Sequence, residues 1–181
     1  MKIRNNKKGF TLIELLAVIV ILGILMIIAI PAVTKYIERS RKDAYADTAK
    51  AYINSARYGI LNEEYDNCPV LPAAGSAIYI QLKYVDIDQG GANSPYSQPI
   101  DKENSYVEIK AEGDETTDKH GTTKYVYSVA IRDALNNGID LTEEDKIDRT
   151  AVQKNTLTAL KAMGNGTKCT KPIKDDINSG E

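Results

Sequence analysis

The sequence contains few of the residues on which catalysis depends. It has a single histidine, His120, in a polar stretch typical of a loop, and neither a cysteine nor a second histidine lies near it. Such a histidine is typical of a surface loop rather than of a zinc site or a general base. The chain also lacks a nucleophile and base constellation, a glycine-rich phosphate loop and P-loop spacing. We therefore expect no enzymatic activity and no cofactor.

Acidic residues are missing from the first nine positions, which hold Lys2, Arg4, Lys7 and Lys8. The balance reverses further on, because residues 62–181 contain 21 acidic and 13 basic side chains. Binding of phosphate groups needs local positive charge. The acidic C-terminal part therefore argues against nucleic acid as the main ligand.

Charged residues are also absent from Leu15 to Thr34. A helix of that length, at about 1.5 Å per residue, spans roughly 30 Å, the thickness of the hydrocarbon core of a membrane. A cleaved secretory signal would have a shorter apolar run, and the best small-residue site here places Pro31 just before the bond to be cut. The stretch predicts one membrane-spanning helix, which in the simplest interpretation is a single-pass anchor.

Basic residues flank this span in equal number, since Lys35, Arg39, Arg41 and Lys42 follow it. The positive-inside rule therefore gives no orientation. The second group could contact anionic lipid headgroups or could simply form a solvated helix face.

One carboxylate, Glu14, lies near the start of the apolar segment. A charged side chain at mid-membrane is energetically costly and usually marks function, although a residue this close to the end of the span could reach the headgroups. Residues 7–16, KKGFTLIELL, resemble the processing motif of prepilins, shared by type IV pilins and the pseudopilins of type II secretion and DNA uptake.

The resemblance implies cleavage between Gly9 and Phe10 by a membrane-embedded prepilin peptidase, which also methylates the new amino group of Phe10. The basic leader, residues 1–9, stays in the cytoplasm. Its removal takes four positive charges away and changes the formal net charge from −2 to −6.

The resemblance also implies a role for Glu14, which would neutralise the terminal amine of a neighbouring subunit inside a bundle of helices. A buried amine and a buried carboxylate are each unfavourable alone, so pairing favours the register in which they meet. The implied partners are other pilin subunits in a homo- or heteropolymer, the peptidase and, indirectly, an assembly platform protein and a cytoplasmic ATPase. The expected location is the bacterial plasma membrane and then a surface filament.

Apolar periodicity continues beyond the membrane segment and predicts a helix from about Phe10 to Leu61. Its buried stripe comprises Ile37, Ala44, Tyr45, Thr48, Ala49, Tyr52, Ile53, Ala56 and Ile60. The expected divisions are a leader (1–9), an assembly half of the helix (10–34), a stem half (35–61) and a globular head (62–181).

Alternating apolar residues predict three strands at about 78–85, 107–112 and 125–132, in an antiparallel sheet with one packed face. The polar run from 112 to 124 predicts a hairpin loop. A weaker helix is expected over 142–163, with Thr142 and Asp145 as a capping box and Val152, Ala159, Leu160 and Met163 on its buried side. The expected fold is α+β, a long N-terminal helix packed on a small antiparallel sheet, as in pilins.

Cys68 and Cys169 make an even count in a domain expected to be exported, which favours one disulfide, with two buried free thiols as the alternative. Asp86 and Asp88 form a weak calcium candidate, because the loop spacing is incomplete and acidic turns are common.

These features favour a structural pilus or pseudopilus subunit, processed after Gly9 and polymerised through its helix. Two alternatives remain: a DNA-uptake pseudopilin or tip or minor pilin whose head binds a ligand, and a simple anchored surface protein.

Overall fold

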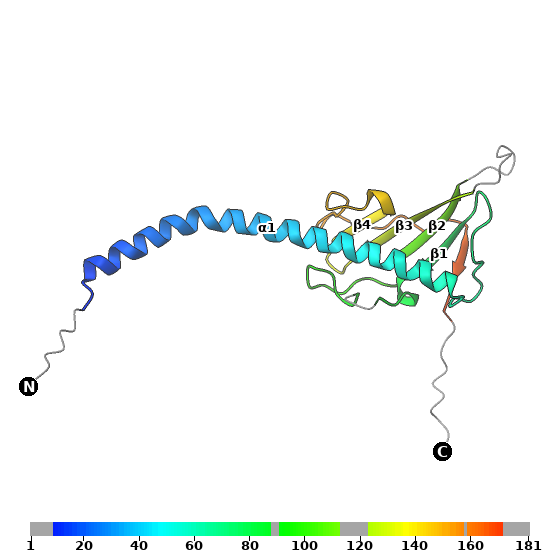
Figure 1. The fold of residues 1–181 in the computed structure, drawn as a ribbon, viewed down its shortest axis with the longest axis horizontal. Helices are drawn as coiled ribbons and strands as arrows, with labels where there is room; N and C mark the ends of the chain where they lie inside the picture. The colour runs from blue at the N-terminus through cyan, green and yellow to red at the C-terminus, as the bar shows by residue number, and fades with distance from the viewer. Residues whose placement is uncertain (1–8, 88–90, 113–122, 158, 172–181) are drawn as a thin grey trace, which may run out of the picture. The chain divides into compact units, whose positions relative to one another are not determined.

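The computed structural model describes residues 9–87, 91–112, 123–157 and 159–171. It contains one long helix, α1 (Leu12–Leu61), and five strands, β1 (Ala77–Gln81), β2 (Tyr106–Glu112), β3 (Lys124–Arg132), β4 (Gly138–Glu143) and β5 (Thr167–Cys169) (Figure 1). The chain divides into two compact units, Met1–Ser40 and Arg41–Glu181, which we call the N-terminal unit and the head unit.

Helix α1 begins and ends within two residues of its predicted limits. At its C-terminal end Glu63 has a positive φ of 56°. The Glu64 amide donates to the Gly59 carbonyl at 2.8 Å and the Glu63 amide to the Ile60 carbonyl at 3.0 Å. This is the Schellman pattern, with glutamate in the left-handed position that glycine usually takes, and it ends the helix at the point where the chain turns toward the sheet.

The sheet is mixed, with the strand order β4-β3-β2-β1-β5. The three predicted strands are confirmed as the antiparallel neighbours β1, β2 and β3. Strand β1 stops at Gln81, earlier than predicted, because Leu82–Tyr84 form a 3-10 turn. The prediction of an entirely antiparallel sheet is wrong at one edge, where β5 pairs in parallel with β1. A three-residue strand carries too short an alternation to be recognised in the sequence.

The core of the head unit lies between α1 and one face of the sheet (Figure 1). The buried residues of α1 are Tyr45, Ala46, Ala49, Tyr52, Ile53, Ala56, Gly59 and Ile60. They meet buried sheet residues such as Ile78, Ile80, Val107, Ile109 and Val129. The predicted stripe is therefore confirmed from Tyr45 onward, whereas Ala44 is exposed.

Buried tyrosines of α1 use their hydroxyl groups to hold two loops. Tyr45 donates to the Asn137 carbonyl at 3.0 Å, and Tyr52 donates to the Gly91 carbonyl at 2.8 Å. Burial raises the pKa of both hydroxyls, that of Tyr52 to about 12. Within the described residues every buried side-chain polar atom has a hydrogen-bond partner. The helix is thus fixed to the head by polar contacts as well as by apolar packing.

The predicted helix over 142–163 is wrong. Its first residues belong to β4, Glu144–Lys146 form a 3-10 turn, and the described residues beyond them are irregular. Val152 packs into the core on the α1 side, whereas Leu160 and Met163 pack beside Tyr79 and Tyr106 in a second cluster. One short helix cannot place a single apolar stripe in two separate clusters. Residues 159–166 therefore extend along the sheet instead of folding on themselves.

Cys68 and Cys169 form a disulfide. The cysteines are 101 residues apart in sequence, so the bond closes most of the head unit into one loop. In the chain-entropy model a loop of that length contributes about 4 to 5 kcal/mol to stability. Cys169 ends β5 opposite Ile80 of β1, so the disulfide ties the short parallel edge strand to the segment that follows α1.

Candidate functional site

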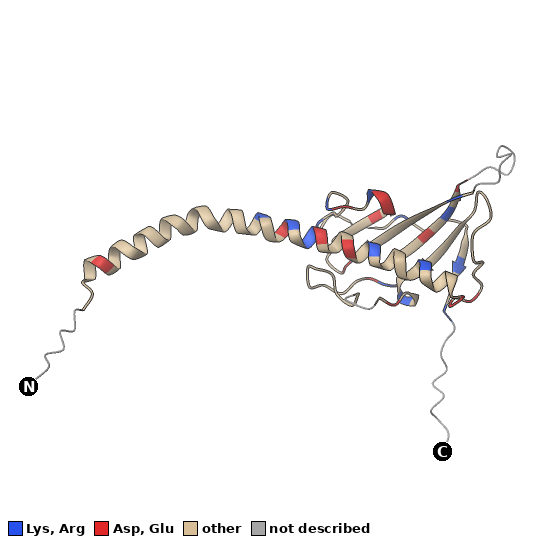
Figure 2. Ribbon diagram, in the orientation of Figure 1, with Lys and Arg blue, Asp and Glu red and all other residues tan. Residues whose placement is uncertain are grey.

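The N-terminal unit has an apolar helix surface that no other described residue of the chain covers. Leu15, Ile19, Ile24, Met26 and Ile28 are each more than half exposed. Figure 2 shows one acidic residue near the start of α1 and then a long stretch of the helix without charged residues. Among the described residues, α1 is the one helix long and apolar enough to cross a membrane, and none of its most apolar stretch is buried. Such a surface needs lipid or other helices around it.

Thr11 and Glu14 form a capping box at the start of this helix. The Thr11 amide and hydroxyl both donate to Glu14 Oε2 at 2.8 Å, and the Glu14 amide donates to Thr11 Oγ1 at 3.3 Å. These bonds satisfy amide groups that the first turn of a helix leaves without partners. Our sequence analysis missed this role of Thr11, although a threonine three residues before a glutamate at the start of an apolar run is its recognised signal.

Gly9 and Phe10, the predicted cleavage site, precede the helix. Both are exposed and outside regular structure, and Phe10 is 94% exposed. No other part of the described chain lies within 4 Å of a side chain built at Gly9. The bond between them is therefore accessible, as a protease requires of its substrate. Lys7 and Lys8 of the motif lie outside the described residues.

Helix α1 continues without a break through Gly23 and Pro31, two residue types that weaken a helix. Pro31 lies inside α1 and cannot donate a backbone hydrogen bond. The Thr34 hydroxyl donates to the carbonyls of Ile30 and Pro31, both at 3.1 Å, as hydroxyls often do in apolar helices. No other part of the described chain lies within 4 Å of a side chain built at Gly23. Both positions leave room for bending or for close approach of a second helix.

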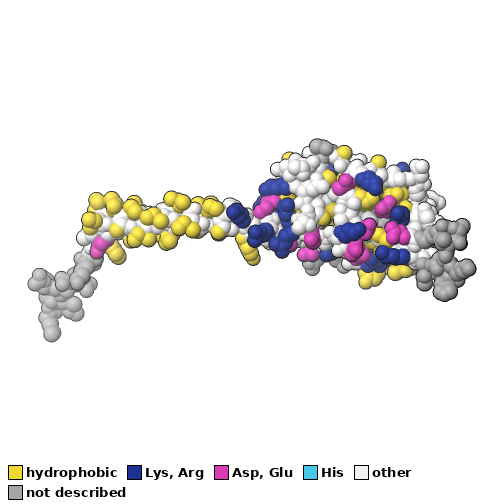
Figure 3. Space-filling view, turned by 90° about the horizontal axis from the view of Figure 1, so that it is seen from above, with side chains coloured by type: hydrophobic (Ala, Val, Ile, Leu, Met, Phe, Trp, Pro, Cys, Tyr) yellow, Lys and Arg dark blue, Asp and Glu magenta, His cyan; other side chains and the backbone are white. Residues whose placement is uncertain are grey.

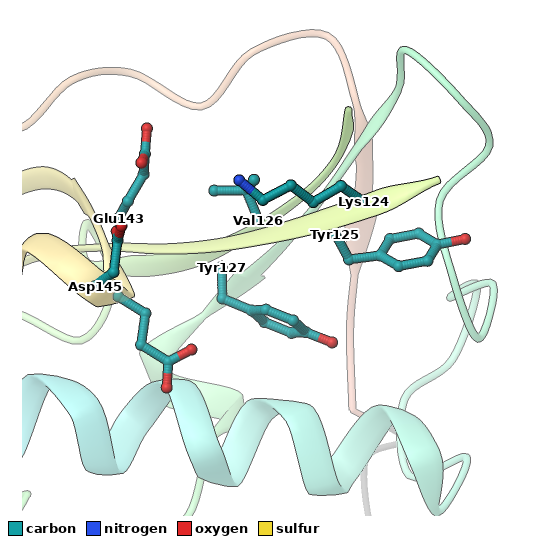
Figure 4. A pocket seen from close by; sticks show the side chains of 7 residues that line it. Lys124, Tyr125, Val126, Tyr127, Glu143 and Asp145 are labelled. Atoms are coloured by element: carbon teal, nitrogen blue, oxygen red, sulfur yellow. The ribbon is translucent and has the colours of Figure 1, made fainter. Parts of the chain in front are cut away.

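A shallow pocket of about 350 Å³ lies in the head unit, lined by Lys124, Tyr125, Val126, Tyr127, Glu143, Glu144 and Asp145 (Figure 4). Two of its acidic residues form ion pairs, Glu144 with Arg57 and Glu143 with Lys146. The Arg57 guanidinium also lies 4.2 Å from the centre of the Tyr127 ring. The two Arg57 contacts hold α1 to β3 and to the 3-10 turn Glu144–Lys146. The described residues that line it include no histidine and no cysteine that could act as a base or nucleophile.

Asp86, one residue of the weak calcium candidate, forms an ion pair within the chain. The Lys171 ammonium lies 2.7 Å from Asp86 and 3.8 Å from Glu64, so a cation of the chain itself already occupies one side of Asp86. Asp88 and His120 lie outside the described residues. Among the described residues no three acidic, histidine or cysteine side chains are grouped as a metal site requires.

Comparison with known proteins gives one family model and several fimbrial proteins that match the chain. A family model described as the prokaryotic N-terminal methylation motif matches residues 4–30. The fimbrial protein EcpC of Eikenella corrodens is 39% identical over 88 residues, which are 46% of this chain and 54% of EcpC. The type IV major alpha-pilin of Moraxella bovis is 60% identical over 37 residues, 20% of this chain and 23% of that protein.

A longer match covers more than half of the chain. The type IV major fimbrial protein FimA of Dichelobacter nodosus is 33% identical over 109 residues, 56% of this chain and 70% of FimA. The matched segments thus span about half of EcpC and more than two thirds of FimA. No solved structure matches the chain significantly. With the methylation motif over residues 4–30, the exposed apolar helix that it overlaps and this match to FimA, the chain belongs to the type IV pilin family.

Proposed function

We propose that the protein is a structural subunit of a type IV pilus, made as a prepilin and polymerised through the apolar half of α1. The observation that carries the proposal is the uncovered apolar surface from Leu15 to Val33, most of which lies within the methylation motif matched over residues 4–30. Side-by-side packing with the same helix of other copies would bury that surface without lipid. The subunit then acts as a building block and not as an enzyme.

Processing precedes assembly in this proposal. A prepilin peptidase cuts between Gly9 and Phe10 and methylates Phe10, and the basic leader is lost. An inner-membrane assembly platform, driven by a cytoplasmic ATPase, then moves the subunit from the plasma membrane into the surface filament. The exposure of Gly9 and Phe10 supports cleavage at this bond, because an exposed bond outside regular structure is cut more readily than one inside a helix.

Assembly uses the Glu14 carboxylate. After cleavage the new amine lies four residues before Glu14 in the sequence, and in the filament we propose that the carboxylate faces the amine of a neighbouring subunit. A charge pair in an apolar bundle adds little net stability, because both groups lose their hydration. It instead penalises every register in which one charge is left alone, and so selects a single stagger between subunits.

Intact-mass and N-terminal sequencing of the protein from cells test the processing proposal. The expected mature chain begins at Phe10 and carries one additional methyl group, and cells without the peptidase should keep the leader. A chain that retains Met1 or Lys2 in cells with an active peptidase would overturn it. That outcome would favour the simple anchored surface protein.

A further inference from the structure

Two asparagine and glycine pairs occur in the sequence, Asn137 with Gly138 and Asn165 with Gly166. The apolar helix of the N-terminal unit, largely yellow in Figure 3, contains no asparagine, so both pairs belong to the head unit. An asparagine followed by glycine is especially prone to lose its side-chain amide, because no side chain hinders attack by the backbone nitrogen of the glycine. The two pairs have opposite surroundings in the fold.

Asn137 is buried, and hydrogen bonds hold both ends of its side-chain amide. The residue is 2% exposed. Its amide group donates to both carboxylate oxygens of Asp133, at 3.1 and 2.9 Å, and its side-chain oxygen accepts from the Asn155 amide at 3.2 Å. The Gly138 amide donates to the Gln153 carbonyl at 2.9 Å. A reaction between the Gly138 nitrogen and the Asn137 side chain would first have to break these bonds.

Asn165 is exposed, and its side chain makes no hydrogen bond to another described residue. Residues 161–166 contain no helix or strand, and pairing with β1 begins only at Thr167. Gly164 and Gly166 flank Asn165, and glycine restricts the backbone least of all residues. Asn165 and Gly166 also line a surface depression of about 360 Å³, so water reaches them.

We propose that Asn165, and not Asn137, is a site of spontaneous deamidation that the fold leaves open. The Gly166 nitrogen gives up its proton to solvent and bonds to the side-chain carbonyl carbon of Asn165. The side-chain nitrogen takes up a proton and leaves as ammonia, and the product is a cyclic succinimide. Water then opens the ring at either carbonyl and gives aspartate or isoaspartate. The net reaction consumes water, releases ammonia and needs no enzyme, and it is independent of the proposed role in a filament.

The modification alters the entrance of β5. Isoaspartate directs the main chain through the former side chain and so lengthens the backbone directly before Gly166. Gly166 already lies against β1, because a side-chain atom built on it would be 2.1 Å from the Ala77 carbonyl oxygen. The added length therefore displaces the start of β5 from β1, while the disulfide still holds Cys169. We expect the head of a modified subunit to be less stable than that of a newly made one.

Peptide mapping of the full-length protein in detergent tests the selectivity. Samples are incubated in mildly alkaline buffer, either folded or in concentrated urea, and digested with trypsin. Cleavage after lysine and arginine releases residues 133–146 and 162–168 as separate peptides, so mass spectrometry with fragmentation follows Asn137 and Asn165 in the same sample. In the folded chain Asn165 should react at least about tenfold faster than Asn137, because several buried hydrogen bonds must open before Asn137 can react.

The samples in urea supply the control for local sequence. Unfolding removes the protection of Asn137, so the two rates should approach each other. A smaller difference in the folded chain would overturn the proposal, because Asn165 would then be protected as well. A preference for Asn165 that persists unchanged in urea would overturn it too, since the local sequence and not the fold would select the site.

Matched variants test the effect on β5. Asn165→Gln keeps the amide but would have to close a larger and less favourable ring, and Asn165→Asp adds the charge without lengthening the backbone. On incubation the urea midpoint of the original chain, followed by circular dichroism, should fall in step with its isoaspartate content, while Asn165→Gln stays unchanged. Freshly made Asn165→Asp should match the fresh original chain. An equal decline in Asn165→Gln, or a fresh Asn165→Asp protein as unstable as the incubated original, would contradict displacement of β5 by the lengthened backbone.

Discussion

At the scale of single residues, one substitution distinguishes the two roles assigned to Glu14, helix capping and pairing with a neighbouring subunit. In the structure it caps its own helix through Thr11, and in the proposed filament it meets a neighbour's amine. Glu14→Gln keeps a side chain that can complete a capping box but removes the charge. We expect this variant to insert and to be processed normally but to be missing from sheared filaments, as measured by immunoblotting of the filament and membrane fractions.

Thr11→Val is the matched change, because it removes the hydroxyl cap and leaves the carboxylate. Loss of an N-cap costs about 1 kcal/mol of helix stability. Filament yield from this variant should fall only modestly, since the charge needed for pairing remains. Normal filaments from Glu14→Gln, with a larger defect from Thr11→Val, would assign Glu14 to capping and contradict the pairing role.

At the scale of elements, the edge strand β5 depends on glycine at its entrance. A side chain built at Gly166 would lie 2.1 Å from the Ala77 carbonyl oxygen of β1, which is too close for any atom and involves backbone that cannot rotate away. Gly166→Ala must therefore displace β5 from β1 and is expected to lower the free energy of unfolding by about 2 to 3 kcal/mol. Urea denaturation of the full chain in detergent, followed by circular dichroism, measures this change.

The neighbouring exposed residue supplies the control for that measurement. Asn165→Ala alters the same segment without adding an atom near β1, so its unfolding free energy should stay within about 0.5 kcal/mol of the original chain. If Gly166→Ala were equally harmless, the parallel pairing of β5 with β1 would not describe the protein in solution.

At the scale of the whole molecule, buried tyrosines make the head sensitive to alkali. Burial raises the pKa of Tyr52 and of Tyr65 to about 12 and also raises that of Tyr45 and of Tyr106. The folded state therefore keeps protons that an unfolded chain would release near pH 10, the ordinary tyrosine value. The resulting stability is complete below pH 10 and is lost as the pH rises from 10 through 12.

Tyrosinate absorbance and urea denaturation across that range test this expectation. The transition midpoint should fall steeply above pH 10, and the buried hydroxyls should ionise together with unfolding. Tyr52→Phe should flatten part of the decline, although it loses the bond to the Gly91 carbonyl and about 1 kcal/mol at neutral pH. Ionisation of all tyrosines near pH 10 while the chain remains folded would contradict the assigned burial.

The sequence alone determined the long helix, three central strands, the family motif and the cysteine pair. These depend on local or periodic information, such as the uncharged run from Leu15 to Thr34 and the alternation through β2 and β3. Such patterns persist whatever the rest of the chain does.

Tertiary structure alone decided the remainder. Residues 142–163 have the apolar spacing of a helix, but Val152 is buried in the main core with residues of α1. Leu160 and Met163 pack in the second cluster, beside Tyr79 and Tyr106. Strand β5 is too short to be recognised from its sequence pattern. It forms because β1 provides hydrogen-bonding partners and the disulfide holds its last residue near the segment that follows α1. The fold likewise brings Arg149 to within 3.0 Å of Asp43 of α1, because the burial of distant segments determines which charged side chains become neighbours.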